Sequence, residues 1–222
     1  MTDTFWSPIY LSLTIALTAG VIVGVIGIVT GRLMARRSFR GKTVIETFMM
    51  LPLVLPPTVV GFILIVLFGI NSPIGKVIES LFDQPIIFTW WAAVLAAVVV
   101  SFPLMYQSAK TGFATVDYEI EDAAKIDGAT SLEVFLRVSI PLAAQAIITG
   151  LVLSFTRALG EFGATLMFAG NIPGKTQTVP TAIYIAFDTG NMKLAWLWVV
   201  SIITLSYLLL FFIYRFSKSA HE

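Results

Sequence analysis

The stretch PIYLSLTIALTAGVIVGVIGIVT, residues 8–30, contains no charged side chain and decides the fold class. A helix needs roughly 20 consecutive apolar residues to cross a bilayer, and this stretch is long enough. The preceding residues, MTDTFWS, contain Asp3 and no basic residue, so we expect a retained span rather than a cleaved signal peptide. Composition agrees, because 57% of the 222 residues are hydrophobic and only 12% are charged. The sequence therefore predicts an integral membrane protein.

Four further apolar runs follow, at residues 47–68, 86–106, 140 to about 169, and 194–214. Each run must be helical, because lipid offers the backbone no hydrogen-bond partner. We predict an all-α protein with about five transmembrane helices in a single domain over residues 1–222. A sixth, short or re-entrant span stays open within residues 160–190, where glycine, proline and polar residues mix with apolar ones.

The segment GRLMARRSFRGK, residues 31–42, joins the first two runs and carries five basic residues and no acid. Short loops rich in lysine and arginine face the cytoplasm. We therefore place this loop, residues 107–139 and the C-terminus in the cytoplasm, and the N-terminus and residues 170–193 outside. The same cluster would also anchor the protein on lipid headgroups.

The segment GNIPGKT, residues 170–176, is similar to a phosphate-binding loop but differs from it in two ways. Its spacing is one residue short of G-x-x-x-x-G-K-[ST], and Pro173 removes one backbone N–H donor. It also falls on the side of the membrane where ATP is absent. We expect a turn that contacts a partner or the entering substrate.

The one long polar interruption is VDYEIEDAAKIDGATSLEVFLRVSIPLAAQ, residues 116–145. Asp117 to Asp127 has helix-compatible residues, and Gly128 stands where a helix commonly ends in a left-handed conformation. Thr130 to Glu133 is a capping-box pattern that starts a second helix leading to Pro141. An amphipathic connector resting on headgroups is one interpretation. The six acids favour the other, a rigid protrusion that meets a protein partner.

At these residues the chain resembles the permease subunits of ABC-type importers. Their signature stands here as Asp122-Ala123-Ala124, Gly128 and Val138-Ser139-Ile140-Pro141. The resemblance implies a type I importer permease fold with a cytoplasmic coupling-helix loop over about residues 107–139. It also implies a homodimer and two cytoplasmic ATP-binding subunits, which bind the ATP and Mg while this chain binds no cofactor. The implied ATPase-coupling residues are Glu121, Asp122, Ala123, Ala124, Gly128 and Pro141, with either Glu121 or Asp122 making the leading acidic contact.

A narrower resemblance covers most of the chain. MLPLVLPPTVVGF, residues 50–62, and RALGEFGATLMFAGNIPGKTQTVPTAIY, residues 157–184, are similar to molybdate permeases, with sulfate and tungstate permeases as close relatives. The resemblance implies import of a tetrahedral oxyanion delivered by an extracytoplasmic binding protein. The sequence itself does not choose among molybdate, tungstate and sulfate or thiosulfate.

Two charges interrupt the fourth run, Arg157 and Glu161. A charge in the membrane costs roughly 2.5–3.5 kcal/mol at a helix centre, so both should face protein or water. Their i,i+4 spacing predicts an ion pair on one helix face. The pair would brace a hinge at Gly160 and Gly163, or Arg157 would meet the anion along its pathway. In the second run, Pro56 and Pro57 should kink or unwind the helix near that pathway.

Other function classes find little support in the sequence. There is no cysteine, the single histidine is His221 near the C-terminus, and no cluster suits catalysis or metal binding. A net charge of +1 argues against nucleic acid as a partner. An ATPase-independent anion carrier is the remaining alternative, but no inverted repeat is evident. We therefore expect a transport subunit and not an enzyme.

Overall fold

The computed structural model describes residues 2–218, and every regular element within that range is a helix. His221 lies outside the described residues. In chain order the elements are α1 (Thr2–Arg36), α2 (Lys42–Val54), α3 (Pro57–Phe68), α4 (Pro73–Phe82), α5 (Trp90–Ala114), α6 (Tyr118–Ile126), α7 (Ser131–Val134), a π-helical turn (Phe135–Ser139), α8 (Ile140–Leu142), α9 (Ala144–Leu159), α10 (Gly163–Phe168), α11 (Val179–Asp188) and α12 (Met192–Lys218).

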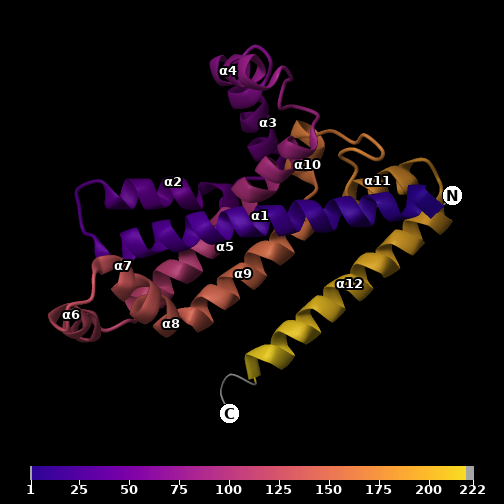
Figure 1. Ribbon diagram of the computed structural model, residues 1–222. Coiled ribbons are helices and arrows are strands. Elements are labelled where there is room, and N and C mark those ends of the chain that lie inside the picture. Colours follow the sequence, from indigo (N-terminus) through magenta and orange to yellow (C-terminus); the bar gives the residue numbers. More distant parts are fainter. Residues whose placement is uncertain (1, 219–222) are drawn as a thin grey trace.

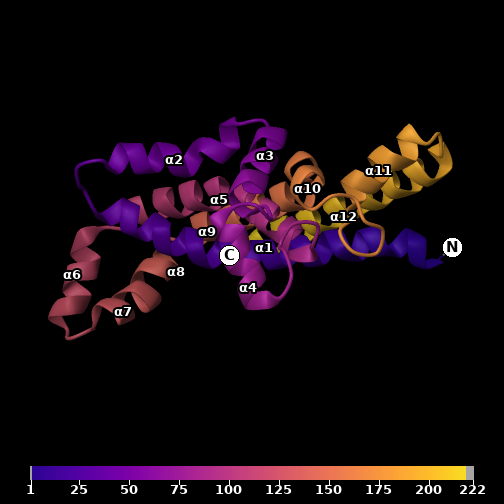
Figure 2. The same cartoon turned by 90° about the horizontal axis from the view of Figure 1, so that it is seen from above.

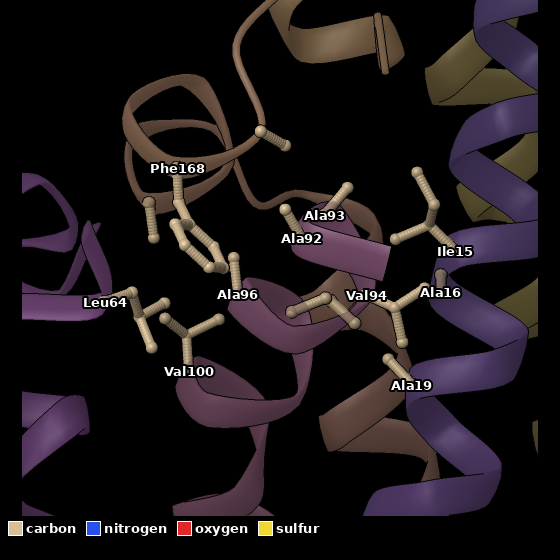
Figure 3. Packing of buried hydrophobic residues seen from close by; sticks show 14 of the residues in the cluster. Ile15, Ala16, Ala19, Leu64, Ala92, Ala93, Val94, Ala96, Val100 and Phe168 are labelled. Carbon is tan, nitrogen blue, oxygen red and sulfur yellow. The ribbon is translucent and has the colours of Figure 1, made fainter. Parts of the chain in front are cut away.

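Helices α1, α5 and α9 pack on one another and form the centre of the molecule (Figure 1). Small side chains bring α1 and α5 close together, with Ala16 and Ala19 facing Val94 in the close view (Figure 3). Further along, a Cβ added at Gly27 would lie 2.5 Å from Met105 Cγ, so the backbones approach closely there. Glycines in the first span thus serve as helix-packing positions, as small residues do in membrane bundles.

In the described part of the chain, three helices are long and apolar enough to cross a membrane alone, within α1, α5 and α12. The number rises to five if each of two bent helix pairs is counted as one span, which agrees with the predicted five. The second apolar run is one of these pairs. It divides into α2 and α3, which meet at 116°. Pro56 caps α3 and Pro57 is its first residue, so the prolines break the run rather than merely kink it.

The fourth run is also interrupted, and the predicted continuous helix from Ile140 to about Ala169 is wrong. Helices α7 to α8 meet α9 at 75°, with the change of direction at Ala143. The chain leaves α9 at Leu159 and starts a new helix, α10, at Gly163. The region left open for a sixth span holds α10 and α11, of six and ten residues, both shorter than a bilayer crossing requires.

The molecule has two distinct ends. Seen from above, α6 and α7 lie at one end, beside the last turns of α1, and α11 lies at the opposite end with the start of α1 (Figure 2). The basic segment 31–42 and the acidic segment 116–145 therefore meet at the same end. This placement agrees with their common assignment to one side of the membrane.

Candidate functional site

The predicted protrusion is built as the sequence indicated. Asp117 caps α6 by accepting a hydrogen bond from the Glu119 N–H at 2.9 Å. Gly128 has φ +95°, the left-handed conformation that ends the helix. Thr130 and Glu133 form the capping box, with the Glu133 carboxylate accepting from the Thr130 N–H at 2.9 Å. The local signals of this segment thus fix a helix, a corner and a second helix.

Glu121 anchors this protrusion to the rest of the chain. Its side chain is buried, and the residue is only 3% exposed. Arg32 donates to both carboxylate oxygens, at 2.7 and 2.9 Å, and Arg36 donates to Oε1 at 2.9 Å. The hydroxyl of Ser139 donates to the same oxygen at 2.8 Å. One carboxylate therefore ties α6 to the end of α1 and to the π-helical turn that leads into the fourth span.

Electrostatics keep this carboxylate charged. Burial raises the pKa of Glu121, but hydrogen bonds from Arg32 and Ser139 and the charge of Arg32 outweigh it and lower the pKa to about 2. Arg36 also stacks on the ring of Tyr118, with its guanidinium carbon 3.9 Å from the ring centroid. The anchor is therefore a network of charge-assisted hydrogen bonds rather than a single pair.

The outer surface of the protrusion is available for contact. Asp122 is exposed and pairs with Lys125, at 2.7 Å, and Ala123 and Pro141 are also exposed. Ile126 is 86% exposed, an unusual position for an isoleucine. Exposed apolar side chains continue over α6, α7 and the π-helical turn: Tyr118, Ile120, Leu132 and Leu136. Of the two acids left open for the leading contact, Glu121 is turned inward and Asp122 outward.

The predicted pair of Arg157 and Glu161 is present, with Arg157 Nη1 2.5 Å from Glu161 Oε2. The prediction that both residues lie on one helix is wrong, because α9 ends at Leu159, between the two residues. Glu161 is 2% exposed, and its other oxygen accepts from the Ala164 N–H at 2.7 Å. The pair thus joins the last turn of α9 to the start of α10 across the break that begins at Gly160.

Helices α10 and α3 pack closely at residues predicted for the pathway. A Cβ added at Gly163 would lie 3.0 Å from Pro57 Cβ, so a side chain there would push α10 away from the start of α3. The structure brings Gly163 together with Pro57, and Arg157 together with Glu161. Whether these residues line the route of an anion stays a prediction.

The loop of residues 170–176 does not form a phosphate cradle. The N–H groups of Lys175, Thr176 and Gln177 all donate to the carbonyl of Ile172. The Thr176 hydroxyl is buried and accepts from the Ile172 N–H at 3.0 Å. The loop follows the short helix α10 and not a strand. Because the N–H groups of Ile172, Lys175 and Thr176 are satisfied within the loop, they are not free to surround a phosphate.

Sequence reasoning missed three partners of Glu121. Arg32 and Arg36 were assigned to orientation and headgroup contact, whereas the structure turns both inward at the anchor. Their i,i+4 spacing was the available signal, because it places two cations on one face of a helix end. Ser139 gave no local signal, since the π-helical turn that directs its hydroxyl toward Glu121 depends on tertiary packing.

Comparisons with known proteins agree with this architecture. Residues 6–221 match the family described as "Binding-protein-dependent transport system inner membrane component". The chain is 62% identical over 217 residues to YvgM of Bacillus subtilis, whose name describes a molybdenum transport system permease, covering 98% of this chain and 95% of that one. It is 41% identical over 204 residues to the molybdenum transport system permease ModB of Escherichia coli K12, covering 91% and 89%. Identity to the sulfate transport system permease CysT of Salmonella typhimurium is 34%, over 90% of this chain and 72% of the relative.

Solved structures show the same fold at low sequence identity. The inward-facing MetNI methionine ABC transporter superposes with a TM-score of 0.74 at 16% identity, covering 99% of this chain and 97% of that one. A bacterial alginate ABC transporter, solved with a pentasaccharide-bound periplasmic protein, gives 0.77 at 12% identity over 98% and 80%. The protein has the type I ABC importer permease fold and is a multi-pass membrane protein. The chain belongs to the family of inner membrane components of binding-protein-dependent transport systems.

Proposed function

We propose that this chain is the membrane-spanning permease of an ATP-driven importer and that an ATP-binding subunit docks on the outer face of α6 and α7. The observation that carries the proposal is the buried carboxylate of Glu121. Its bonds to Arg32, Arg36 and Ser139 fix the protrusion to the end of α1 and to the π-helical turn that leads into the fourth span. Force applied at the exposed side chains of Asp122 or Ile126 therefore reaches the spans directly.

The functional assembly that we propose contains two copies of this chain, two ATP-binding subunits and an extracytoplasmic binding protein. The ATP-binding subunits bind the ATP and Mg. The description of the family as binding-protein-dependent supports the external partner. The shared location of the basic segment and the protrusion supports a cytoplasmic position for both. In this orientation the N-terminus lies outside and the C-terminus in the cytoplasm.

Molybdate is the substrate that we propose. The relatives at 62% and 41% identity carry molybdenum in their names, and the sulfate permease stands at 34%. Tungstate and sulfate or thiosulfate are the alternative substrates, because they are tetrahedral oxyanions of the same charge. An ATPase-independent carrier is disfavoured, since it would leave the anchored protrusion and its exposed apolar face without a role.

Reconstitution tests these assignments together. Proteoliposomes containing the permease and its ATP-binding subunits, supplied with the external binding protein, should accumulate molybdate only when ATP is present. An excess of sulfate should compete poorly. Accumulation without ATP or without the ATP-binding subunits would contradict the importer, and preferential accumulation of sulfate would contradict the substrate.

A further inference from the structure

A second polar cluster lies at the ends of α2 and α5 that are nearest the protrusion, and the Glu121 anchor does not use it. Lys110 Nζ lies 2.6 Å from Glu46 Oε1, and the Tyr106 hydroxyl donates to the same oxygen at 3.2 Å. Lys42 Nζ lies 4.0 Å from that oxygen, one turn away along α2. Three side chains from two helices thus converge on one carboxylate.

An open cavity of about 480 Å³ adjoins this cluster. Its lining includes Glu46, Thr47, Tyr106, Gln107 and Lys110. A second cavity, of about 390 Å³, shares Gln107 with the first and continues across α5 toward α9. Polar side chains line it in turn: Ser108, Thr111, Gln145 and Thr149. In the two cavities, polar side chains of α2, α5 and α9 form a band that lies beside the apolar Met50, Leu51 and Val54 of α2.

This band cannot face hydrocarbon at low cost. Charged and amide side chains in the membrane face water or protein, because lipid leaves them unsolvated. Yet Thr47, Gln107 and Thr111 are exposed in the single chain. Lys110 lies twenty residues after Trp90, or about 30 Å along α5 at ~1.5 Å per residue. That distance is the thickness of the hydrocarbon core, so the band lies at the cytoplasmic mouth of the spans.

We propose that Lys110 binds the tetrahedral oxyanion as it leaves the membrane, with Glu46 as the counterion that holds Lys110 when no anion is present. The inference rests on the proposed import function. Lys42, Lys110 and Glu46 together carry one net positive charge, which attracts a dianion without retaining it tightly. Gln107, which lines both cavities, adds a neutral hydrogen-bond donor near Lys110, and Thr111 adds another in the second cavity.

The second lysine makes the exchange feasible. When Lys110 turns from Glu46 toward the anion, the carboxylate would otherwise lose its counterion in a partly buried site, which is unfavourable. Lys42 already lies at the edge of ion-pair distance from the same oxygen and is partly exposed, so it can move closer. The carboxylate stays paired throughout, and Lys110 is released to the passing ion.

The absence of cysteine from the sequence allows a direct test with a single introduced thiol. Gln107→Cys places the thiol one helical turn from Lys110. The permease in complex with its ATP-binding subunits would be held in phosphatidylcholine nanodiscs, and the rate of modification by a neutral thiol reagent measured against molybdate concentration. Molybdate should slow the reaction. Adding Lys110→Gln should raise the half-protecting concentration about tenfold, since one charge-assisted hydrogen bond is lost.

Two further variants separate anion binding from a purely structural ion pair. Glu46→Gln should lower the half-protecting concentration, because the competitor for Lys110 is removed. A structural role predicts instead that Glu46→Gln and Lys110→Gln are equally harmful. Arg40→Gln is the control. Arg40 is a basic residue at the same end of the molecule but does not line the cavity, so its replacement should leave protection by molybdate unchanged. If Gln107→Cys impairs assembly, Thr111→Cys serves as the reporter.

Unchanged protection in the Lys110→Gln variant would overturn the inference. So would slowing that requires phosphatidylglycerol in the nanodiscs and not molybdate, since a lipid headgroup would then occupy the site. Uptake of molybdate by wild-type proteoliposomes, measured in parallel, keeps the two proposals distinct. Uptake without protection contradicts only the Lys110 site, whereas the absence of uptake contradicts the proposed function.

Discussion

Arg32 donates two parallel hydrogen bonds to Glu121, at 2.7 and 2.9 Å, although 89 residues separate them in the sequence. Such two-point pairing fixes both the position and the orientation of the two side chains. It joins the end of the first membrane helix to the centre of α6. The stiffness of the protrusion therefore depends on a long-range contact and not on its own short helices.

Glu121→Gln should weaken this junction strongly. The amide cannot neutralise two arginines, and breaking a buried ion pair by removing one partner costs about 3 kcal/mol or more. We expect a lower thermal unfolding midpoint in detergent and reduced ATP-driven uptake. The matched control is Asp122→Asn, which removes an exposed pair and should change the free energy of unfolding by less than about 1 kcal/mol. Equal stability losses in the two variants would contradict the anchor.

The same junction should be sensitive to acid. The pKa of Glu121 is lowered from its ordinary value of 4.5 to about 2. A lowered folded-state pKa adds stability that is complete above pH 4.5 and is lost as the pH falls from there toward 2. The difference in unfolding midpoint between wild type and Glu121→Gln should therefore be constant near neutrality and shrink below pH 4.5. A difference that persists undiminished at pH 3 would be inconsistent with this assignment.

Gly128→Val should distort the corner between α6 and α7. No atom would clash with the new Cβ, but φ +95° costs a side-chain-bearing residue about 1–2 kcal/mol. We expect weaker association with the ATP-binding subunit, measured by co-purification. Gly128→Asn should retain more association, because asparagine tolerates the left-handed conformation. Association that is unaffected by valine would show that the corner is not part of the docking surface.

Gly31→Leu should separate α1 from α5. A Cβ at Gly31 would lie 2.8 Å from Ala109 Cβ and 2.9 Å from the Lys110 backbone nitrogen, and backbone cannot yield as a flexible side chain can. Overpacking of this kind costs roughly 1–3 kcal/mol, which should appear as a lower unfolding midpoint. Gly20→Ala is the control, since its Cβ would meet only Phe155 at 3.8 Å. A similar loss in both variants would argue against close packing at Gly31.

The loss of stability on substituting Glu161 should depend on which residue replaces it. Glu161→Gln loses the ion pair with Arg157 but keeps an oxygen for the Ala164 N–H, whereas Glu161→Ala loses both. We expect alanine to cost about 1 kcal/mol more than glutamine, the value of one net hydrogen bond. Unfolding measurements on the two variants check the order. A reversed order would mean that the carboxylate does not cap α10.

The parts of the fold that the sequence predicted are governed by local chemistry. The helix of α6, the corner at Gly128 and the capping box at Thr130 follow from residues within a few positions of one another. The transmembrane helices likewise follow from the length and composition of the apolar runs, because in lipid only a helix satisfies the backbone hydrogen bonds of a single segment.

The parts that the sequence did not predict depend on distant contacts. Pro56 and Pro57 indicated a kink or unwinding, but not the 116° between α2 and α3, which accompanies the packing of α3 on α10. The end of α9 before Glu161 also needed the structure, since i,i+4 spacing suits a continuous helix equally well. Arg32 and Arg36 were not recognised as partners of Glu121, because the cytoplasmic orientation of a basic loop already explains basic residues at a membrane boundary.

Helix α1 is also attached at its opposite end, where the Ser12 hydroxyl accepts a hydrogen bond from the Val179 N–H at 2.8 Å, at the start of α11. Arg32 lies twenty residues after Ser12, about 30 Å away along one unbroken helix. In the orientation that we propose, a rotation imposed on α1 at its cytoplasmic end, near Arg32, would therefore be transmitted through the rigid helix to its external end, near Ser12. Opening on one face and closure on the other would then be a single mechanical event rather than two signals relayed in sequence.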